Sequence, residues 1–132
     1  MISSCPYPGP NSSDPEDITA VFPPGLGILL VGADTTTVTE NKVTDNGFAG
    51  IAVTSLCLAF TLQGQACPPL DVDPNPDHNR IVRNRSTGNG KVFTGNPFLE
   101  SVRGDLLWDG SGVGNCWSDN KFATSFPAVL PF

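Results

Sequence analysis

The chain has 132 residues, a net charge of −6 and a pI near 4.4, which is enough length for one domain with a real core. The acidic balance argues against nucleic-acid binding, because phosphate backbones are bound by basic surfaces. No apolar run approaches the roughly 20 residues of a membrane span.

Glycine and proline punctuate the whole chain. The 14 glycines and 13 prolines lie between short apolar runs rather than in one tract, which predicts frequent turns rather than disorder. They also interrupt nearly every window in which apolar residues would recur at helical spacing. We therefore expect an all-β protein.

The first 24 residues are predicted to form an irregular arm or cap. They are rich in Pro, Ser and Asp, and residues 18–22 are the one strand candidate among them. Met1 is followed by neither a charged start nor an apolar signal segment. We interpret Met1 as the start of a mature or trimmed chain; the alternative is the C-terminal part of a longer protein.

A short apolar run bounded by glycines begins at residue 27 and returns 23 positions later, at residue 50. Residues 105–108 stand for the same strand further along the chain. Because side chains alternate along a strand, we expect matched residues of the first two runs to point inward: Ile28 with Ile51, and Leu30 with Val53.

An asparagine also recurs in one frame. In each copy an apolar or aromatic residue comes first, two other residues follow, and the asparagine is the fourth residue. The three copies are Asn41, Asn84 and Asn120, and the pairs Asn46-Gly47 and Asn89-Gly90 follow the first two at the same interval. Asn and Gly tolerate the left-handed backbone of tight bends, and stacked Asn side chains can form hydrogen-bonded ladders.

A unit of about 22 residues with three short strands and sharp bends is typical of a stacked solenoid. Inserts at residues 55–78 and around 94–104 separate the copies. The prediction is a parallel β-helix domain over residues 25–132. The alternative is an antiparallel sandwich whose turns happen to contain Asn and Gly.

These repeats resemble the right-handed parallel β-helix repeat proteins, which include pectate-lyase-like and carbohydrate-binding modules. Residues 105–112, 114–122, 124–127 and 73–77 look like the C-terminal part of uncharacterised bacterial members. The resemblance covers roughly residues 25–127 and implies a short right-handed parallel β-helix of about four coils. Typical members are longer. The fold carries lyases, hydrolases and adhesins alike, so the resemblance does not select one reaction.

The four cysteines permit three pairings. Cys57 and Cys67 flank a short segment that can close as a local loop, and Cys5 and Cys116 would then tie the arm to the body. The alternative is four buried free thiols. Together with glycosylation-type triplets at Asn11 and Asn84, the cysteines indicate a secreted or cell-surface protein.

Four oxygen-bearing side chains alternate in a segment that resembles the start of a calcium loop: Asp71, Asp73, Asn75 and Asp77. Pro76 replaces the loop glycine and no Glu stands at the twelfth position, so the segment is not an EF-hand. A solvated turn is the alternative, and any bound calcium would be structural. We predict no other cofactor.

Acidic and basic side chains suit polysaccharide chemistry, in which paired carboxylates cleave glycosides and a basic group abstracts a proton in lyases. Glu40, Arg83 and Asp119 occupy equivalent positions, just before the repeated asparagines, so they are expected to stack. A solvated charge ladder is the alternative. Asp105 and Glu40 are among the carboxylates that suit glycoside cleavage. The residues considered as catalytic candidates are Asp109, Arg83, Asp45 and Asp119.

Two tryptophans suit different roles. Trp108 is a candidate for stacking on sugar rings, whereas Trp117 replaces the core residues Val38 and Ile81 of the other copies.

The leading functional hypothesis is a module without catalysis that binds a polysaccharide or cell-surface glycan, or that self-associates through its solenoid ends. The rival hypothesis is a polysaccharide-active lyase or hydrolase that uses Asp and Arg side chains on one face.

Overall fold

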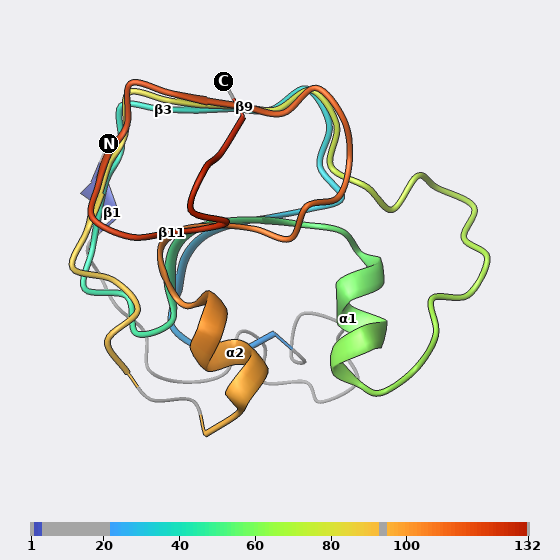
Figure 1. Cartoon of the computed structure of the whole chain (residues 1–132). Helices are drawn as coiled ribbons and strands as arrows, with labels where there is room; N and C mark the ends of the chain where they lie inside the picture. Colours follow the sequence, from blue (N-terminus) through green and yellow to red (C-terminus); the bar gives the residue numbers. More distant parts are fainter. Residues whose placement is uncertain (1, 4–21, 93–94, 132) are drawn as a thin grey trace.

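The computed structural model of the chain describes residues 2–3, 22–92 and 95–131 (Figure 1). The strands are β1 (Ile2–Ser3), β2 (Leu26–Val31), β3 (Thr37–Thr39), β4 (Lys42–Thr44), β5 (Ala49–Thr54), β6 (Arg80–Val82), β7 (Arg85–Thr87), β8 (Gly104–Trp108), β9 (Cys116–Ser118), β10 (Lys121–Phe122) and β11 (Ser125–Phe126). Two helices complete it, α1 (Cys57–Leu62) and α2 (Pro97–Val102).

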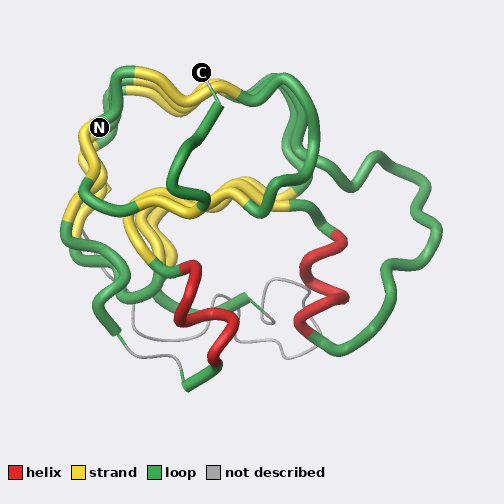
Figure 2. Tube along the Cα trace, viewed as in Figure 1, coloured by secondary structure: helices red, strands yellow, loops and turns green. Residues whose placement is uncertain are grey.

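The strands form three parallel sheets with the orders β1-β4-β7-β10, β11-β8-β5-β2 and β3-β6-β9. The chain enters these sheets in the same order three times, as the trios β2-β3-β4, β5-β6-β7 and β8-β9-β10. Viewed along the stack, the trios overlie one another (Figure 2). The prediction of an all-β protein is confirmed, and the antiparallel alternative is wrong because every strand pair among the described residues is parallel.

The register of the glycine-bounded strands is the predicted one. Ile28 pairs with Ile51, which pairs with Leu106. Leu30 pairs with Val53 in the same way. These residues belong to the core cluster inside the stack, so the 23-residue interval corresponds to one step between neighbouring strands.

A second apolar cluster lies on the outer face of sheet β11-β8-β5-β2. Ala49, Ala52 and Leu107 pack there against Val102 of α2, and both helices lie on this side of the sheet (Figure 1). Strand β5 is therefore buried at every residue. Burial on both faces explains its unbroken run of small and apolar residues.

The two ends of the stack differ from the expectation in one respect. Ile2–Ser3 form β1 beside β4, although the predicted arm was irregular; the strand candidate at residues 18–22 lies outside the described residues except for Phe22. At the other end, Leu130 packs against the inner cluster, and the backbone N–H of Trp117 donates to the carbonyl of Pro131 at 2.8 Å. The C-terminal segment crosses this end of the stack (Figure 1).

The cysteines follow the prediction in part. Cys57 and Cys67 form a disulfide, as expected. Cys116 is a free cysteine, which corrects the expected pairing with Cys5; Cys5 itself lies outside the described residues. Neither helix in the described ranges is long and apolar enough to cross a membrane.

The glycosylation-type triplet at Asn84 is not a glycosylation site in this fold. Asn84 is 2 % exposed and its amide is hydrogen-bonded, so the side chain is inaccessible. The triplet at Asn11 lies outside the described residues.

Candidate functional site: a charged groove beside the asparagine ladder

The three equivalent asparagines form a ladder, in which Asn41 and Asn84 are buried and Asn120 is half-buried. The backbone N–H and Nδ2 of Asn41 donate to Asn84 Oδ1 at 3.0 and 3.1 Å. The same groups of Asn84 donate to Asn120 Oδ1 at 2.9 and 3.1 Å. The Oδ1 atoms of Asn84 and Asn120 thus each accept from both a neighbouring amide and the backbone N–H at a bend, as the sequence predicted.

A second ladder joins Asn46 to Asn89 and ends on a carboxylate. Asp105 Oδ1 accepts the backbone N–H and Nδ2 of Asn89, both at 3.0 Å. Asp105 Oδ2 accepts the backbone N–H groups of Ala123 and Thr124 at 2.9 and 3.1 Å. Asp105, one of the acidic side chains that suited glycoside chemistry, is therefore a structural group.

A third ladder was not predicted. Asn79 N–H and Nδ2 donate to Asn115 Oδ1 at 3.1 and 3.0 Å, and Asn79 Oδ1 accepts the N–H of Thr36. The signal was present in the sequence, because Asn79 and Asn115 each precede a ladder asparagine by five residues. It was missed because Thr36, not Asn, stands five residues before Asn41 in the first copy.

The residue before each ladder asparagine bends the chain. Glu40, Arg83 and Asp119 have φ values of 58°, 54° and 57°, in the left-handed region that costs a non-glycine residue roughly 1–2 kcal/mol. Their backbones stack, since the N–H of Glu40 donates to the carbonyl of Arg83. Arg83 Nε lies 3.7 Å from Glu40 Oε1. The predicted charge stacking is present, but both side chains are well exposed, so the pair adds little stability.

The residue after each asparagine of the first ladder, Asn41, Asn84 and Asn120, is basic. Lys42, Arg85 and Lys121 are exposed and lie directly beside one another in neighbouring strands. We call these three residues the basic column. Neighbouring strands are roughly 4.8 Å apart, and like charges placed side by side destabilise a sheet. None of the three forms a salt bridge with another described residue.

The basic column and the stacked residues Glu40, Arg83 and Asp119 border a shallow groove of about 490 Å³ that runs along the stack. Asn41 and Asn84 lie between these two rows. The basic column forms one side, and Glu40, Arg83 and Asp119 form the other. Arg83 and the basic column together hold four of the seven Lys and Arg residues of the chain. The groove therefore concentrates positive charge on an otherwise acidic protein.

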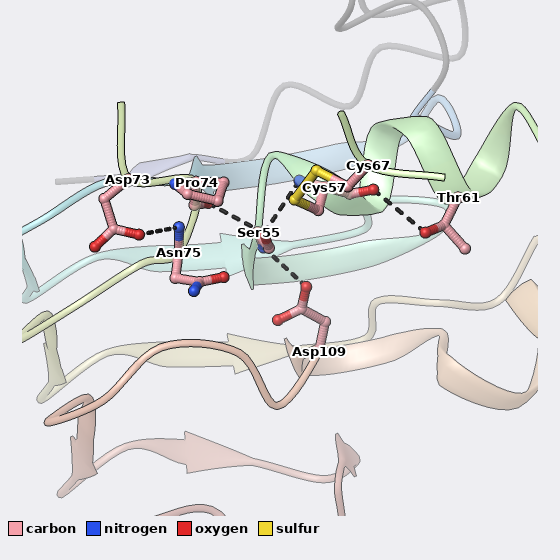
Figure 3. The surroundings of a disulfide bond; sticks show 8 residues. All are labelled: Ser55, Cys57, Thr61, Cys67, Asp73, Pro74, Asn75 and Asp109. Carbon is pink, nitrogen blue, oxygen red and sulfur yellow. Dashed lines mark hydrogen bonds between the residues drawn. A yellow bond between two sulfur atoms is a disulfide. The ribbon is translucent and has the colours of Figure 1, made fainter. Parts of the chain in front are cut away.

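Only two of the four catalytic candidates share this groove. Arg83 and Asp119 line it, whereas Asp109 lines a separate cavity. Asp109 Oδ2 accepts the N–H of Ser55 at 2.8 Å (Figure 3), and its Oδ1 accepts the N–H of Ser111 at 3.0 Å. Asp45 lies at the next bend of the chain, at a φ of 61°. The four side chains do not form one site.

The expected calcium ligands do not converge. Within the described residues there is no cluster of three His, Cys, Asp or Glu side chains suited to a metal ion. Asp73 Oδ1 accepts the N–H of Asn75 at 3.0 Å within its own turn (Figure 3), and Asp71 is exposed. Asp77 Oδ1 accepts the N–H of Val113 at 2.8 Å. These contacts support the alternative, a solvated turn.

Trp108 is not placed as a sugar platform. Its ring centroid lies 5.2 Å from that of Trp117, it packs against the inner cluster, and its Nε1 donates to the carbonyl of Ser111 at 2.9 Å. Inward-facing Trp108 follows from the register, since it pairs with buried Val53. Trp117 is 4 % exposed and pairs with Ile81, so its predicted core role is confirmed.

Comparisons of the chain with protein-family models, with curated proteins and with solved structures found no match.

Proposed function

We propose that the chain is a short right-handed parallel β-helix of about four coils, secreted or on the cell surface, that binds an anionic polysaccharide or cell-surface glycan along the charged groove. The repeated visits to three parallel sheets and the stacked asparagines support the β-helix. The Cys57–Cys67 disulfide is compatible with an oxidising compartment.

The observation that carries the binding proposal is the basic column. Three cations at neighbouring strands repel one another, and described acidic side chains do not pair with them. A linear polymer with regularly repeated carboxylates supplies the missing counter-charge along the same direction. Glu40 and Asp119 on the opposite side of the groove disfavour polymers of much higher charge density.

Isothermal titration with a linear polyuronate and with a neutral glucan tests this proposal. We expect the polyuronate to bind, the neutral polymer not to bind, and added salt to weaken binding. Arg85→Glu reverses the charge at the centre of the column and is expected to weaken binding about tenfold or more. Lys91→Glu makes the same charge change at an exposed residue outside the groove and is the matched control.

Equal losses of polyuronate affinity in the two variants would show that only the net charge of the protein matters. They would exclude the groove as the binding site. Equal binding of the neutral glucan would exclude an electrostatic site.

A second candidate is a polysaccharide-active enzyme, favoured by the presence of Arg83 beside Glu40 and Asp119 in one groove. It predicts release of sugar fragments from the bound polymer. Loss of that release in both Arg83→Ala and Asp119→Asn, with polymer binding retained, would establish catalysis. If the bound polymer stays intact, the enzyme candidate is excluded and the binding module remains.

Self-association through the ends of the stack belongs to the same proposal. Strands β2 and β3 are the edges of their sheets at one end, and edge strands can pair with another copy. Sedimentation equilibrium over a range of concentrations measures it; a constant monomer mass would exclude this part.

A further inference from the structure

A cavity of about 480 Å³ lies apart from the groove, on the outer face of sheet β11-β8-β5-β2. Residues of β2, β5, β8, α1 and α2 line it, and most are apolar, including Leu29, Ala52, Leu58, Leu99 and Leu107. The two helices lie on the same side of the sheet (Figure 1). Its volume is in the range of small-molecule sites, which are concave and mainly apolar.

The arrangement of the helices explains the open space. Leu99 and Val102 of α2 pack on the second apolar cluster and cover one part of the sheet face. Helix α1 is held by the Cys57–Cys67 disulfide and by the hydrogen bond from the N–H of Cys57 to Ser55 Oγ (Figure 3). Because the helices have six residues each, they leave apolar sheet surface between them.

The lining of this cavity includes a polar group with an unmet hydrogen bond. Thr54 lines the cavity, is 1 % exposed, and its Oγ1 has no hydrogen-bond partner. Side chains alternate along a strand, so Thr54 shares the outer face of β5 with Ala52. Leaving a buried hydroxyl unpaired is unfavourable, and such groups in native proteins call for an explanation.

The Asp109 carboxylate lies near Thr54 and limits which ligand head groups the cavity can bind. Asp109 lines the same cavity and holds its carboxylate through the N–H groups of Ser55 and Ser111. The described lining residues include no Lys, Arg or His. An anionic head group would therefore meet a carboxylate with no compensating cation.

We propose that the cavity binds a neutral amphipathic small molecule with an apolar body and a hydroxyl head. The body lies on Leu29, Ala52 and Leu107 between the helices. The hydroxyl oxygen accepts a hydrogen bond from Thr54 Oγ1, and its proton is directed to the Asp109 carboxylate. This site is independent of the glycan groove, since the two share no lining residue.

The test uses 1-decanol and decanoate as probes of equal chain length, with binding followed by NMR titration of the folded chain. We expect decanol to shift amide signals of β5, α1 and α2, and decanoate at neutral pH to bind at least about tenfold more weakly. Thr54→Val removes an unpartnered hydroxyl without loss of a hydrogen bond, so the fold is retained. It is expected to weaken decanol binding about threefold to tenfold.

Thr44→Val is the matched control, because Thr44 lies in β4 outside the cavity; its affinity is expected to equal that of the unchanged chain. Leu58→Trp fills the cavity from α1 and is expected to abolish binding. The proposal is overturned if decanol does not bind, if decanoate binds equally well, or if Thr54→Val binds as Thr44→Val does. Retained binding in a folded Leu58→Trp variant would place the ligand elsewhere and overturn it too.

Discussion

Replacing Asn84 with leucine tests whether the asparagine ladder holds the stack together. The two side chains have the same number of heavy atoms and branch at the same carbon, so the change removes hydrogen bonds without opening a cavity. Asn84 Oδ1 accepts from the N–H and Nδ2 of Asn41, and Asn84 Nδ2 donates to the carbonyl of Val38 at 2.8 Å. With leucine at position 84, the N–H and Nδ2 of Asn41 and the carbonyl of Val38 lose the hydrogen bonds that they make to Asn84.

The magnitude follows from the number of groups left unpaired. A buried polar group without a partner costs about 1–3 kcal/mol. The N–H and Nδ2 of Asn41 and the carbonyl of Val38 are all in buried surroundings, so we expect these three groups to cost about 3–9 kcal/mol. Small domains have a total free energy of unfolding of about 5–15 kcal/mol, so the loss would be a large part of it.

Urea unfolding followed by circular dichroism measures the effect. Asn120→Leu is the control, because Asn120 is the last member of the same ladder and is only half-buried, so water can replace part of what is lost. We expect it to lose about 1–2 kcal/mol. A loss below about 1 kcal/mol for Asn84→Leu, or one no larger than for Asn120→Leu, would refute the reasoning.

Three further changes have defined outcomes. Gly50→Ala places a methyl group against Asn89 Nδ2 and the carbonyl of Asp105, both at 2.7 Å. It is expected to lower the melting temperature far more than Gly64→Ala, whose added carbon meets nothing within 4 Å and whose φ of 74° costs an alanine only about 1–2 kcal/mol. Both oxygens of Asp105 accept from N–H donors, so Asp105→Asn turns its NH₂ group toward such donors whichever way the amide points. Urea unfolding should show a loss of about 2–4 kcal/mol in the free energy of unfolding. The control is the exposed Asp119→Asn, which should lose under about 0.5 kcal/mol. Replacing Cys57 and Cys67 with serine opens a loop with a sequence separation of 10, and calorimetry should show about 2–3 kcal/mol less stability, an effect that a reductant reproduces in the unchanged chain; insensitivity to reductant would contradict it.

The sequence predicted the features that depend on a repeated frame of residues. Matching frames placed Ile28 beside Ile51 and Asn41 beside Asn84, although the first pair is 23 and the second 43 residues apart, because each copy of the pattern corresponds to one step between parallel strands. The same alignment stacked Arg83 with Glu40. Trp117 was predicted as a core residue because it occupies the position of Ile81. Position within a repeat is a local property, so the order of residues is enough to show it.

The misjudged residues are those whose role depends on a partner from a distant insert or bend. Asp105 suited glycoside chemistry by residue type, but the fold brings four N–H donors to its two oxygens. Alternation of Asp71, Asp73 and Asp77 suggested a metal loop, but Asp77 is directed to the N–H of Val113. Trp108 was assigned to a ligand because its facing direction depends on the register with β5.

By itself the amino-acid sequence determined the parallel strands, their register and two of the three asparagine ladders, because a repeated frame of residues makes equivalent residues neighbours once the chain stacks. Only the tertiary structure decided which charged side chains line the groove. It also decided which carboxylates accept hydrogen bonds from backbone N–H groups. It also decided that α1 and α2 leave an apolar cavity over one sheet. These features arise where inserts of unequal length return to the stack, and the lengths of the inserts do not reveal where their side chains come to lie.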